Sequence, residues 1–332
     1  MTTRSTLRTL AAAALLPALA CTLPAAAQSL RPPTDFPRKP IRLIVPFAPG
    51  GNTDFLARLV GQKLTESWGQ QIIADNRPGA GGSVAGELTA RAAPDGYTML
   101  MISITNSIAA TLHPGLPYDV VRDFAPLVLL ATTPQVLLAH PSLPVKSVRE
   151  LVAFAKARPG KLSYASAGTG GGTHLTGELL KQVAGLDIVH IPYKGGGPAL
   201  IDLVAGQVDL QITGLVSALS FIKSKRANPL AVTGARRAPA APDIVSMAES
   251  GLPEVDANSW YGLVAPAATP REIIAQLNGE IARILAVPDL RARLAADGAE
   301  AGGGTPEQFG AYIRAEIAKW ARVIRLANIR AH

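Results

Sequence analysis

The stretch Pro46-Phe47-Ala48-Pro49-Gly50-Gly51-Asn52-Thr53-Asp54 decides how the chain begins to fold. It follows a short apolar run at 41–45 and precedes an amphipathic run at 55–64. This order predicts a strand, a glycine turn and a helix N-terminus. Such a helix begins with unpaired backbone N–H groups, and glycines let a ligand approach the main chain. The stretch is therefore either an anion-binding turn or, more simply, a tight turn with a helix cap at Asn52 or Thr53.

The first 27 residues have the pattern of a secretory signal peptide. Arg4 and Arg8 form its charged start, and Ala25-Ala26-Ala27 ends in a typical cleavage site. The apolar run between them is too short, and too interrupted by Pro17, to form a stable membrane span. We therefore expect cleavage near Ala27, no membrane insertion of the mature chain, and a location in the periplasm.

Cys21 is the single cysteine of the chain and lies inside the predicted signal peptide. The residues before it, Ala18-Leu19-Ala20, lack the leucine that a lipoprotein signal has three positions before its cysteine, so lipidation is not expected. Cleavage then leaves a mature chain without cysteine, which excludes disulfides and thiolate chemistry.

The net charge of +8 is spread thinly over the 332 residues, and its densest cluster is Lys223-Ser224-Lys225-Arg226. Proteins that bind nucleic acid concentrate basic residues on one face and often interleave aromatic residues, which this chain does not do. No nucleic-acid partner is expected. The mature chain is long enough for two lobes with substantial cores.

Strand and helix patterns alternate through the first part of the chain. Strands are expected at 41–45, 71–75 and 97–104, and helical patterns at 55–64 and 84–92 lie between them. This βαβαβ order predicts a largely parallel sheet.

An apolar run at 127–139 is then expected to pass between two lobes. A second α/β unit follows, with strands expected at 162–165, 188–192 and 208–213. A return strand at 260–265 precedes three C-terminal helices, and no further strand is expected between those helices. The predicted organisation is a signal peptide at 1–27, a discontinuous first lobe at 28–126 and 252–332, and a second lobe at 127–251.

Four glycine-rich turns, each between a predicted strand and a predicted helix, occur in both parts of the chain, at 47–54, 76–83, 166–174 and 193–199. In an open α/β sheet such turns gather at the carboxyl ends of the strands, where ligands bind. Two lobes that face each other through these turns would enclose a cleft rich in backbone N–H donors and poor in catalytic side chains. This pattern favours binding over catalysis.

Motifs for cofactors and catalysis are incomplete in this chain. It contains no P-loop and no nucleophile elbow, and the run at 168–173 misses the third glycine of the dinucleotide fingerprint. His174 and Glu178 have the spacing of two ligands on one helix face, but no third ligand is evident. We therefore predict no cofactor, no metal and no catalytic residue.

Three residues near these turns allow two interpretations each. His174 either orients its turn or contacts a ligand, or it is a partly exposed histidine at a helix start. Tyr193 and Lys194 are either a pocket wall and a cation, or a core tyrosine and a solvated lysine.

A set of motifs resembles the Bug receptors, the periplasmic solute-binding subunits of tripartite tricarboxylate transporters. The resemblance covers nearly all of the mature chain. It rests on Pro46-Phe-Ala-Pro-Gly-Gly with Asp54 and Arg58, Asn76-Arg-Pro-Gly-Ala-Gly-Gly, Pro94-Asp-Gly-Tyr, Ser166-Ala-Gly with His174-Leu, Gly177-Glu-Leu, Pro192-Tyr-Lys-Gly with Pro198-Ala, and Trp260-Tyr-Gly-Leu.

The resemblance implies an α/β fold of the two-lobed type II periplasmic binding protein class. Each lobe is then a mostly parallel sheet flanked by helices, and the ligand cleft lies between the lobes. It also implies that main-chain groups and ordered waters hold the carboxylate, without an arginine clamp.

Carried over by position, the resemblance places the 47–54 and 166–174 turns on opposite sides of one carboxylate, and the 193–199 turn completes the second lobe's side. The predicted ligand-binding residues are Phe47, Ala48, Gly50, Gly51, Thr53, Asp54, Ser103, Thr105, Ser166, Gly168, Thr169, Gly170, Gly171, Thr173, His174, Tyr193, Gly195, Gly196, Ala199 and Thr213.

Two departures from the family pattern affect this expectation. Thr213, followed by Gly214, stands where relatives usually have an aspartate, so the distal end of the pocket is expected to lack an acidic partner. Residues 223–229 replace the usual basic-glycine segment.

The sequence therefore predicts a monomeric periplasmic receptor that captures a small mono-, di- or tricarboxylate by lobe closure and delivers it to the subunits of a membrane permease. It is not expected to be an enzyme. The alternatives are an exported α/β enzyme with His174 as base, and a ligand-sensing partner of a two-component system.

Overall fold

A computed structural model describes residues 36–326, and the predicted signal peptide, its cleavage site and Cys21 lie outside them. The strands of the described residues are β1 (Ile41–Val45), β2 (Ile72–Asn76), β3 (Thr98–Ser103), β4 (Phe124–Ala139), β5 (Ser163–Ser166), β6 (Val189–Pro192), β7 (Leu210–Gly214), β8 (Asn228–Val232), β9 (Asn258–Pro266) and β10 (Glu300–Gly303). The helices are α1 (Asn52–Trp68), α2 (Ser83–Ala90) after the 3-10 turn η1 (Ala80–Gly82), α3 (Ile104–Leu112), α4 (Val148–Lys156), α5 (Gly172–Ala184), α6 (Gly196–Val204), α7 (Leu215–Lys223), α8 (Arg271–Leu285), α9 (Pro288–Ala296) and α10 (Pro306–Leu326).

The strands form one mixed sheet in the order β2-β1-β3-β9-β4-β7-β5-β6, and β8 and β10 also pair with β4. β1 runs parallel to β2 and β3, and β5 runs parallel to β6 and β7. These two parallel groups confirm the predicted βαβ units. The centre of the sheet is antiparallel, because β4 pairs in that sense with both β9 and β7.

β4 belongs to both groups and divides the sheet. Its residues up to Pro134 pair with β9, and from Gln135 onward they pair with β7. We call β1, β2, β3, β9, β10 and residues 124–134 half A, and β5 to β8 with residues 135–139 half B. The apolar run expected to pass between two lobes is thus one long strand shared by both halves.

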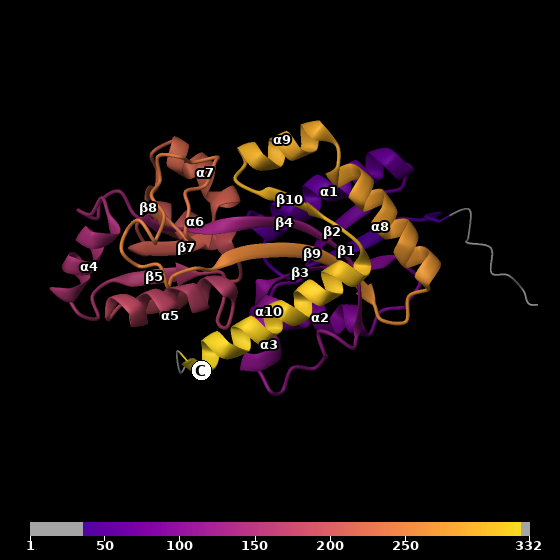
Figure 1. The fold of residues 1–332 in the computed structure, drawn as a ribbon, viewed down its shortest axis with the longest axis horizontal. Helices are drawn as coiled ribbons and strands as arrows, with labels where there is room; N and C mark the ends of the chain where they lie inside the picture. The colour runs from indigo at the N-terminus through magenta and orange to yellow at the C-terminus, as the bar shows by residue number, and fades with distance from the viewer. Residues whose placement is uncertain (1–35, 327–332) are drawn as a thin grey trace, which may run out of the picture. The chain divides into compact units, whose positions relative to one another are not determined.

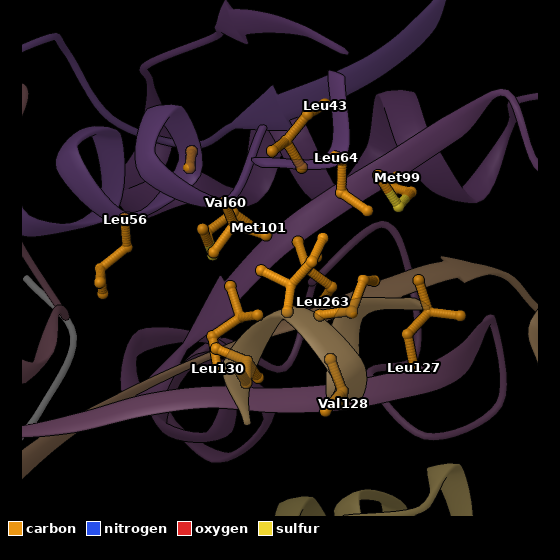
Figure 2. Packing of buried hydrophobic residues seen from close by; sticks show 14 of the residues in the cluster. Leu43, Leu56, Val60, Leu64, Met99, Met101, Leu127, Val128, Leu130 and Leu263 are labelled. Atoms are coloured by element: carbon orange, nitrogen blue, oxygen red, sulfur yellow. The ribbon is translucent and has the colours of Figure 1, made fainter. Parts of the chain in front are cut away.

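Helices cover both faces of each half (Figure 1). In half A, α1, α8 and α9 pack in one apolar cluster, and α2, α3 and α10 pack in the other. In half B, α4 and α5 share one cluster with the strands, and α6 and α7 share the second. Figure 2 shows the first of these clusters, in which Leu56 and Val60 of α1 face Leu130 of β4 and Leu263 of β9. The strand-turn-helix units are thus held by ordinary apolar burial.

Four elements are absent from the sequence prediction: α3, α7, β8 and β10. β10 lies between α9 and α10 and pairs with β4, so the expectation of three C-terminal helices without a strand was wrong. Its sequence, Glu300-Ala301-Gly302-Gly303, lacks the β-branched and aromatic residues that mark strands. α3 follows β3 directly at Ile104 and was not foreseen, because an apolar strand that runs into an apolar helix shows no change of period.

No helix within residues 36–326 combines the length and the apolar character needed to cross a membrane.

Candidate functional site

The carboxyl ends of the parallel strands in both halves meet around a cavity of about 50 Å³. Half A lines it with the turn after β1, the β3–α3 junction and β9, and half B lines it with the starts of α5 and α6 and the end of β7. None of the lining side chains is charged. The lining residues are Phe47, Gly51, Asn52, Thr53, Ser103, Ile104, Thr105, Ala167, Gly172, Thr173, Gly196, Thr213, Gly214, Ser259 and Tyr261.

Five helices begin at this cavity: α3, whose N-cap Ser103 forms a capping box, and α1, α5, α6 and α7. The N-cap residue is a glycine in four of these helices: Gly51 in α1, Gly171 in α5, Gly195 in α6 and Gly214 in α7. None of these four helices has a side-chain cap from its own N-cap residue. Each helix N-terminus carries partial positive charge and N–H groups without intrahelical partners. Their convergence on an uncharged cavity favours a negatively charged ligand.

Side chains of half A partly cap the helices of half B. Asn52 Oδ1 accepts a hydrogen bond from the backbone N–H of Ser217 in the first turn of α7, at 2.8 Å. Thr105 Oγ1 accepts a longer one from the N–H of Gly172 at the start of α5, at 3.4 Å. Asn52 Nδ2 in turn donates to Tyr261 Oη at 3.1 Å. The cavity is thus formed by hydrogen bonds that span the two halves.

Main chains of the two halves touch where glycines face each other. Ala48 N donates to Lys194 O at 2.8 Å, beside the start of α6. A Cβ on Gly197 would lie 2.4 Å from Pro49 O, and a Cβ on Gly81 would lie 2.9 Å from Thr169 O. Only glycine permits these approaches, so the turns carry their glycines for contact between halves as well as for turn geometry.

A buried carboxylate holds the 47–54 turn in place. Asp54 accepts hydrogen bonds from Gly50 N at 3.1 Å, Arg58 Nε at 3.0 Å and Asn76 Nδ2 at 3.0 Å. Burial by itself raises the pKa of Asp54, but the bonds from Arg58, Gly50 and Asn76 outweigh it and hold the pKa below its ordinary value. Asp54 therefore stays ionised and positions the turn from outside the cavity.

Two stacked histidines hold the 166–174 turn. The rings of His174 and His190 stack with centroids 4.0 Å apart, and His190 Nε2 lies 2.7 Å from Ser166 Oγ. His174 Nδ1 accepts a hydrogen bond from Gly170 N at 3.0 Å. The His174 ring thus orients the turn, which is one of the two roles that the sequence allowed for it.

The histidine pair predicts a pH-dependent stability. Burial first, and then the neighbouring His174, lower the pKa of His190 from 6.5 to about 4. The unfolded chain therefore binds this proton more readily than the folded chain, so the contribution to stability is complete above about pH 6.5 and is lost as the pH falls toward 4. We expect a loss of roughly 1–2 kcal/mol in the free energy of unfolding, discounted for partial exposure.

Urea unfolding between pH 7 and pH 4 tests this prediction. His190→Gln should flatten the curve of unfolding free energy against pH relative to the parent protein. His140→Gln, at a half-buried histidine outside the stacked pair, should not change the shape of that curve. Parallel curves for the parent and His190→Gln would contradict the assignment. Glu178 and Lys181, which also act on His190, are unchanged in both variants.

Comparison with known proteins places this chain in a family. Residues 56–329 match the model described as "Tripartite tricarboxylate transporter family receptor". The chain is also 39% identical over 292 residues to Protein BugT of Bordetella pertussis, covering 87% of this chain and 90% of that protein. The chain belongs to the tripartite tricarboxylate transporter receptor family. The resemblance to the Bug receptors is confirmed.

Further relatives of this receptor agree in sequence and fold. It is 40% identical over 290 residues to the UPF0065 protein in the tcbD-tcbE intergenic region of Pseudomonas sp. (strain P51), covering 87% and 86% of the two chains. The solved structure "R. palustris Rpa4515 with adipate" has a TM-score of 0.87 and 37% identity, covering 89% and 99% of the two chains. The periplasmic binding protein BugD has a TM-score of 0.86 and 32% identity, with the same coverage. These likenesses confirm the two-lobed periplasmic binding protein fold, and the family and fold are those of solute-binding receptors.

The receptor's structure brings together eight of the residues predicted to bind ligand. Those that line the small cavity are Phe47, Gly51, Thr53, Ser103, Thr105, Thr173, Gly196 and Thr213. Gly168, Thr169 and Tyr193 instead line a larger neighbouring cavity, together with Phe47. The others lie in the same turns and elements but line neither cavity: Ala48, Gly50, Asp54, Ser166, Gly170, Gly171, His174, Gly195 and Ala199.

Several residues that line the small cavity of the receptor were missed. Asn52 lies in the first turn but was considered only as a cap, and Ser259 and Tyr261 lie on β9. β9 reaches the site because Tyr261 pairs with Ser103 of β3. The available signal for these two β9 residues was that Ser259 and Tyr261 are polar residues within an apolar run. The missed residues are Asn52, Ile104, Ala167, Gly172, Gly214, Ser259 and Tyr261.

Proposed function

We propose that this receptor binds a small carboxylate in the cavity between the two halves and delivers it to a membrane permease. The observation that carries the proposal is the convergence of the α1, α5, α6 and α7 N-termini on a cavity without a charged side chain. A carboxylate there receives N–H groups and four positive dipole ends without an arginine or lysine. Relatives solved with adipate and with malate support the same ligand class.

Lobe closure is the proposed working motion. The chain passes between the halves within β4, at Pro134 and Gln135, and returns before β9. Rotation about these two crossings would separate the glycine contacts and the Asn52–Ser217 bond. It would also part Leu175 and Val216 of half B from the apolar clusters of half A. The moving bodies are half A and half B, which divide within β4 between Pro134 and Gln135. A permease would recognise the closed, ligand-bound form, and the receptor would act as a periplasmic monomer.

Calorimetry and thermal unfolding of the purified protein test the binding proposal. A panel of mono-, di- and tricarboxylates should contain ligands that stabilise the protein by about 2.7 kcal/mol at a hundred times their Kd. The corresponding amides, which match the acids in shape but lack charge, are the controls and should not bind. Equal binding of acid and amide would contradict an anion site. Consumption of a bound acid would instead favour the enzyme alternative.

A further inference from the structure

Gln135 is a buried glutamine whose side-chain amide has no hydrogen-bond partner within residues 36–326, at either Oε1 or Nε2. The residue is 0% exposed and is the first residue of β4 that pairs with half B. Its backbone is bonded on both sides, because Gln135 N donates to Thr233 Oγ1 at 2.9 Å and Gln135 O accepts from Thr233 N at 2.8 Å. The backbone therefore fixes this side chain at the crossing between the halves.

The amide of Gln135 lies on the sheet face that α5 covers. Alternate residues of a strand point to opposite faces, and Leu137, two positions further on, packs in the apolar cluster of α4 and α5. Gln135 Nε2 lies 3.7 Å from the position that a Cβ on Gly172 would occupy, at the start of α5. Cγ2 of Ile104, the first residue of α3 in half A, lies 2.6 Å from the same position. The amide is thus at the contact between the halves, beside a side chain of half A.

Rotation of the halves would uncover this amide. Thr105 Oγ1 adds a second contact from half A, because it accepts a hydrogen bond from Gly172 N at 3.4 Å. Ile104 and Thr105 would move away from Gly172 together when the halves separate. Water would then reach the Gln135 amide and form the hydrogen bonds that no protein group supplies in the arrangement seen here. A buried amide that loses its bonds to water without gaining others raises the free energy of the buried form.

Gln211 offers a comparison within half B. It is also 0% exposed, and its Oε1 likewise has no partner within the described residues. Its Nε2, however, donates to Gly196 O at 3.1 Å, and both residues belong to half B. Rotation of the halves would leave that bond intact. The surroundings of the Gln135 amide, in contrast, depend on whether the halves are together or apart.

We propose that Gln135 opposes closure of the ligand-free receptor and so sets the population of its closed form. The free receptor stays mostly open because closure removes water from the amide, and a bound ligand supplies the free energy that overcomes this cost. Gln135 lines neither the small cavity nor its larger neighbour, so it acts on affinity through the equilibrium between open and closed forms. This inference rests on the lobe closure of the proposed function.

Distance measurements by electron paramagnetic resonance on the ligand-free protein test the inference. Spin labels at Leu88→Cys in α2 and Ile201→Cys in α6, in a Cys21→Ser background, occupy exposed positions in opposite halves and outside both cavities. The label distance in this structure is the reference for the closed form. Gln135→Met, which keeps the length of the side chain without its amide, should raise the ratio of closed to open receptor about tenfold. Gln207→Met, at an exposed glutamine of half B, is the matched control and should leave that ratio unchanged.

Calorimetry with the tightest-binding acid of the carboxylate panel measures the consequence for affinity. Gln135→Met should bind this acid up to about tenfold more tightly. Gln135→Glu, which buries a charge on closure, should bind it roughly tenfold more weakly or worse. Thermal unfolding shows whether each variant has folded like the parent protein.

The two measurements separate the inference from the proposed function. A closed population that is unchanged in Gln135→Met would overturn the inference. A closed population that falls would also overturn it, because the amide would then stabilise the closed form. If no carboxylate of the panel binds to the parent protein, the proposed carboxylate binding fails, while the label distances of the ligand-free protein still decide the role of Gln135.

Discussion

Gly197→Ala should lower the affinity for the carboxylate ligand by about a hundredfold or more, with the fold of each half intact. The new Cβ would lie 2.4 Å from Pro49 O and 2.9 Å from the carbonyl carbon of Gly50. Both are backbone atoms and cannot rotate away, so the halves cannot approach as closely as they do here. Gly197 lies in α6, where alanine is the better helix former, so half B itself should tolerate the change. The substitution therefore raises the free energy of the closed state, and the apparent affinity falls as the closed state becomes less populated.

Calorimetry with the best ligand of the panel measures this loss, and thermal unfolding of the free protein shows whether the fold is retained. Gly279→Ala is the matched control, because Gly279 also lies in a helix, α8, and nothing lies within 4 Å of its Cβ position. It should keep the affinity of the parent protein. Unchanged affinity in Gly197→Ala would show that ligand binding does not require the contact between Gly197 and the 47–54 turn.

Asn52→Asp is expected to abolish carboxylate binding at neutral pH, with a loss of about a hundredfold or more. Asn52 is 6% exposed and lines the small cavity. Aspartate has the same shape and can still accept the bond from Ser217 N, but it adds a negative charge to a cavity that has none. At a few ångströms and reduced dielectric, repulsion between two carboxylates amounts to several kcal/mol. Binding should recover in part at lower pH, because burial raises the pKa of the new carboxyl and acid neutralises it.

Titrating the parent protein and this variant with ligand from pH 7 to pH 5 checks both parts of the expectation. Asn52→Leu is the uncharged control. It loses the bonds to Tyr261 and Ser217, so its affinity should fall less, and the deficit should not depend on pH. A variant Asn52→Asp that binds the ligand as tightly as the parent protein would refute an anionic ligand at this site.

Local signals account for what could be predicted of the site. A strand, a glycine turn and a helix start are each marked by residues within a few positions of one another, as in Gly50-Gly51 before α1. Three of the predicted turns meet at the cavity, and five of their predicted residues line it: Phe47, Gly51, Thr53, Thr173 and Gly196. Asp54 shows the limit of this approach. It belongs to the turn, but its bonds to Arg58 and Asn76 direct it away from the cavity.

Long-range pairing accounts for what could not be predicted. β10 has no strand signal of its own and becomes a strand because β4 offers it hydrogen-bonding partners. Ser259 and Tyr261 reach the cavity because β9 lies between β3 and β4, an order that no local pattern contains. α3 was missed because its apolar residues continue those of β3.

The sequence by itself determined the α/β alternation, the glycine-rich turns and the resemblance to the family. These properties depend on residues that are neighbours in the sequence. Only the tertiary structure decided which helix N-termini share one cavity and which side chains cap them. Asn52 and Ser217 are 165 positions apart, and their hydrogen bond exists only because β4 carries the chain from one half of the sheet to the other. Contacts between residues so far apart in the sequence depend on the order of the strands in the sheet. That order is determined by burial of the whole chain, so neither residue alone predicts the contact.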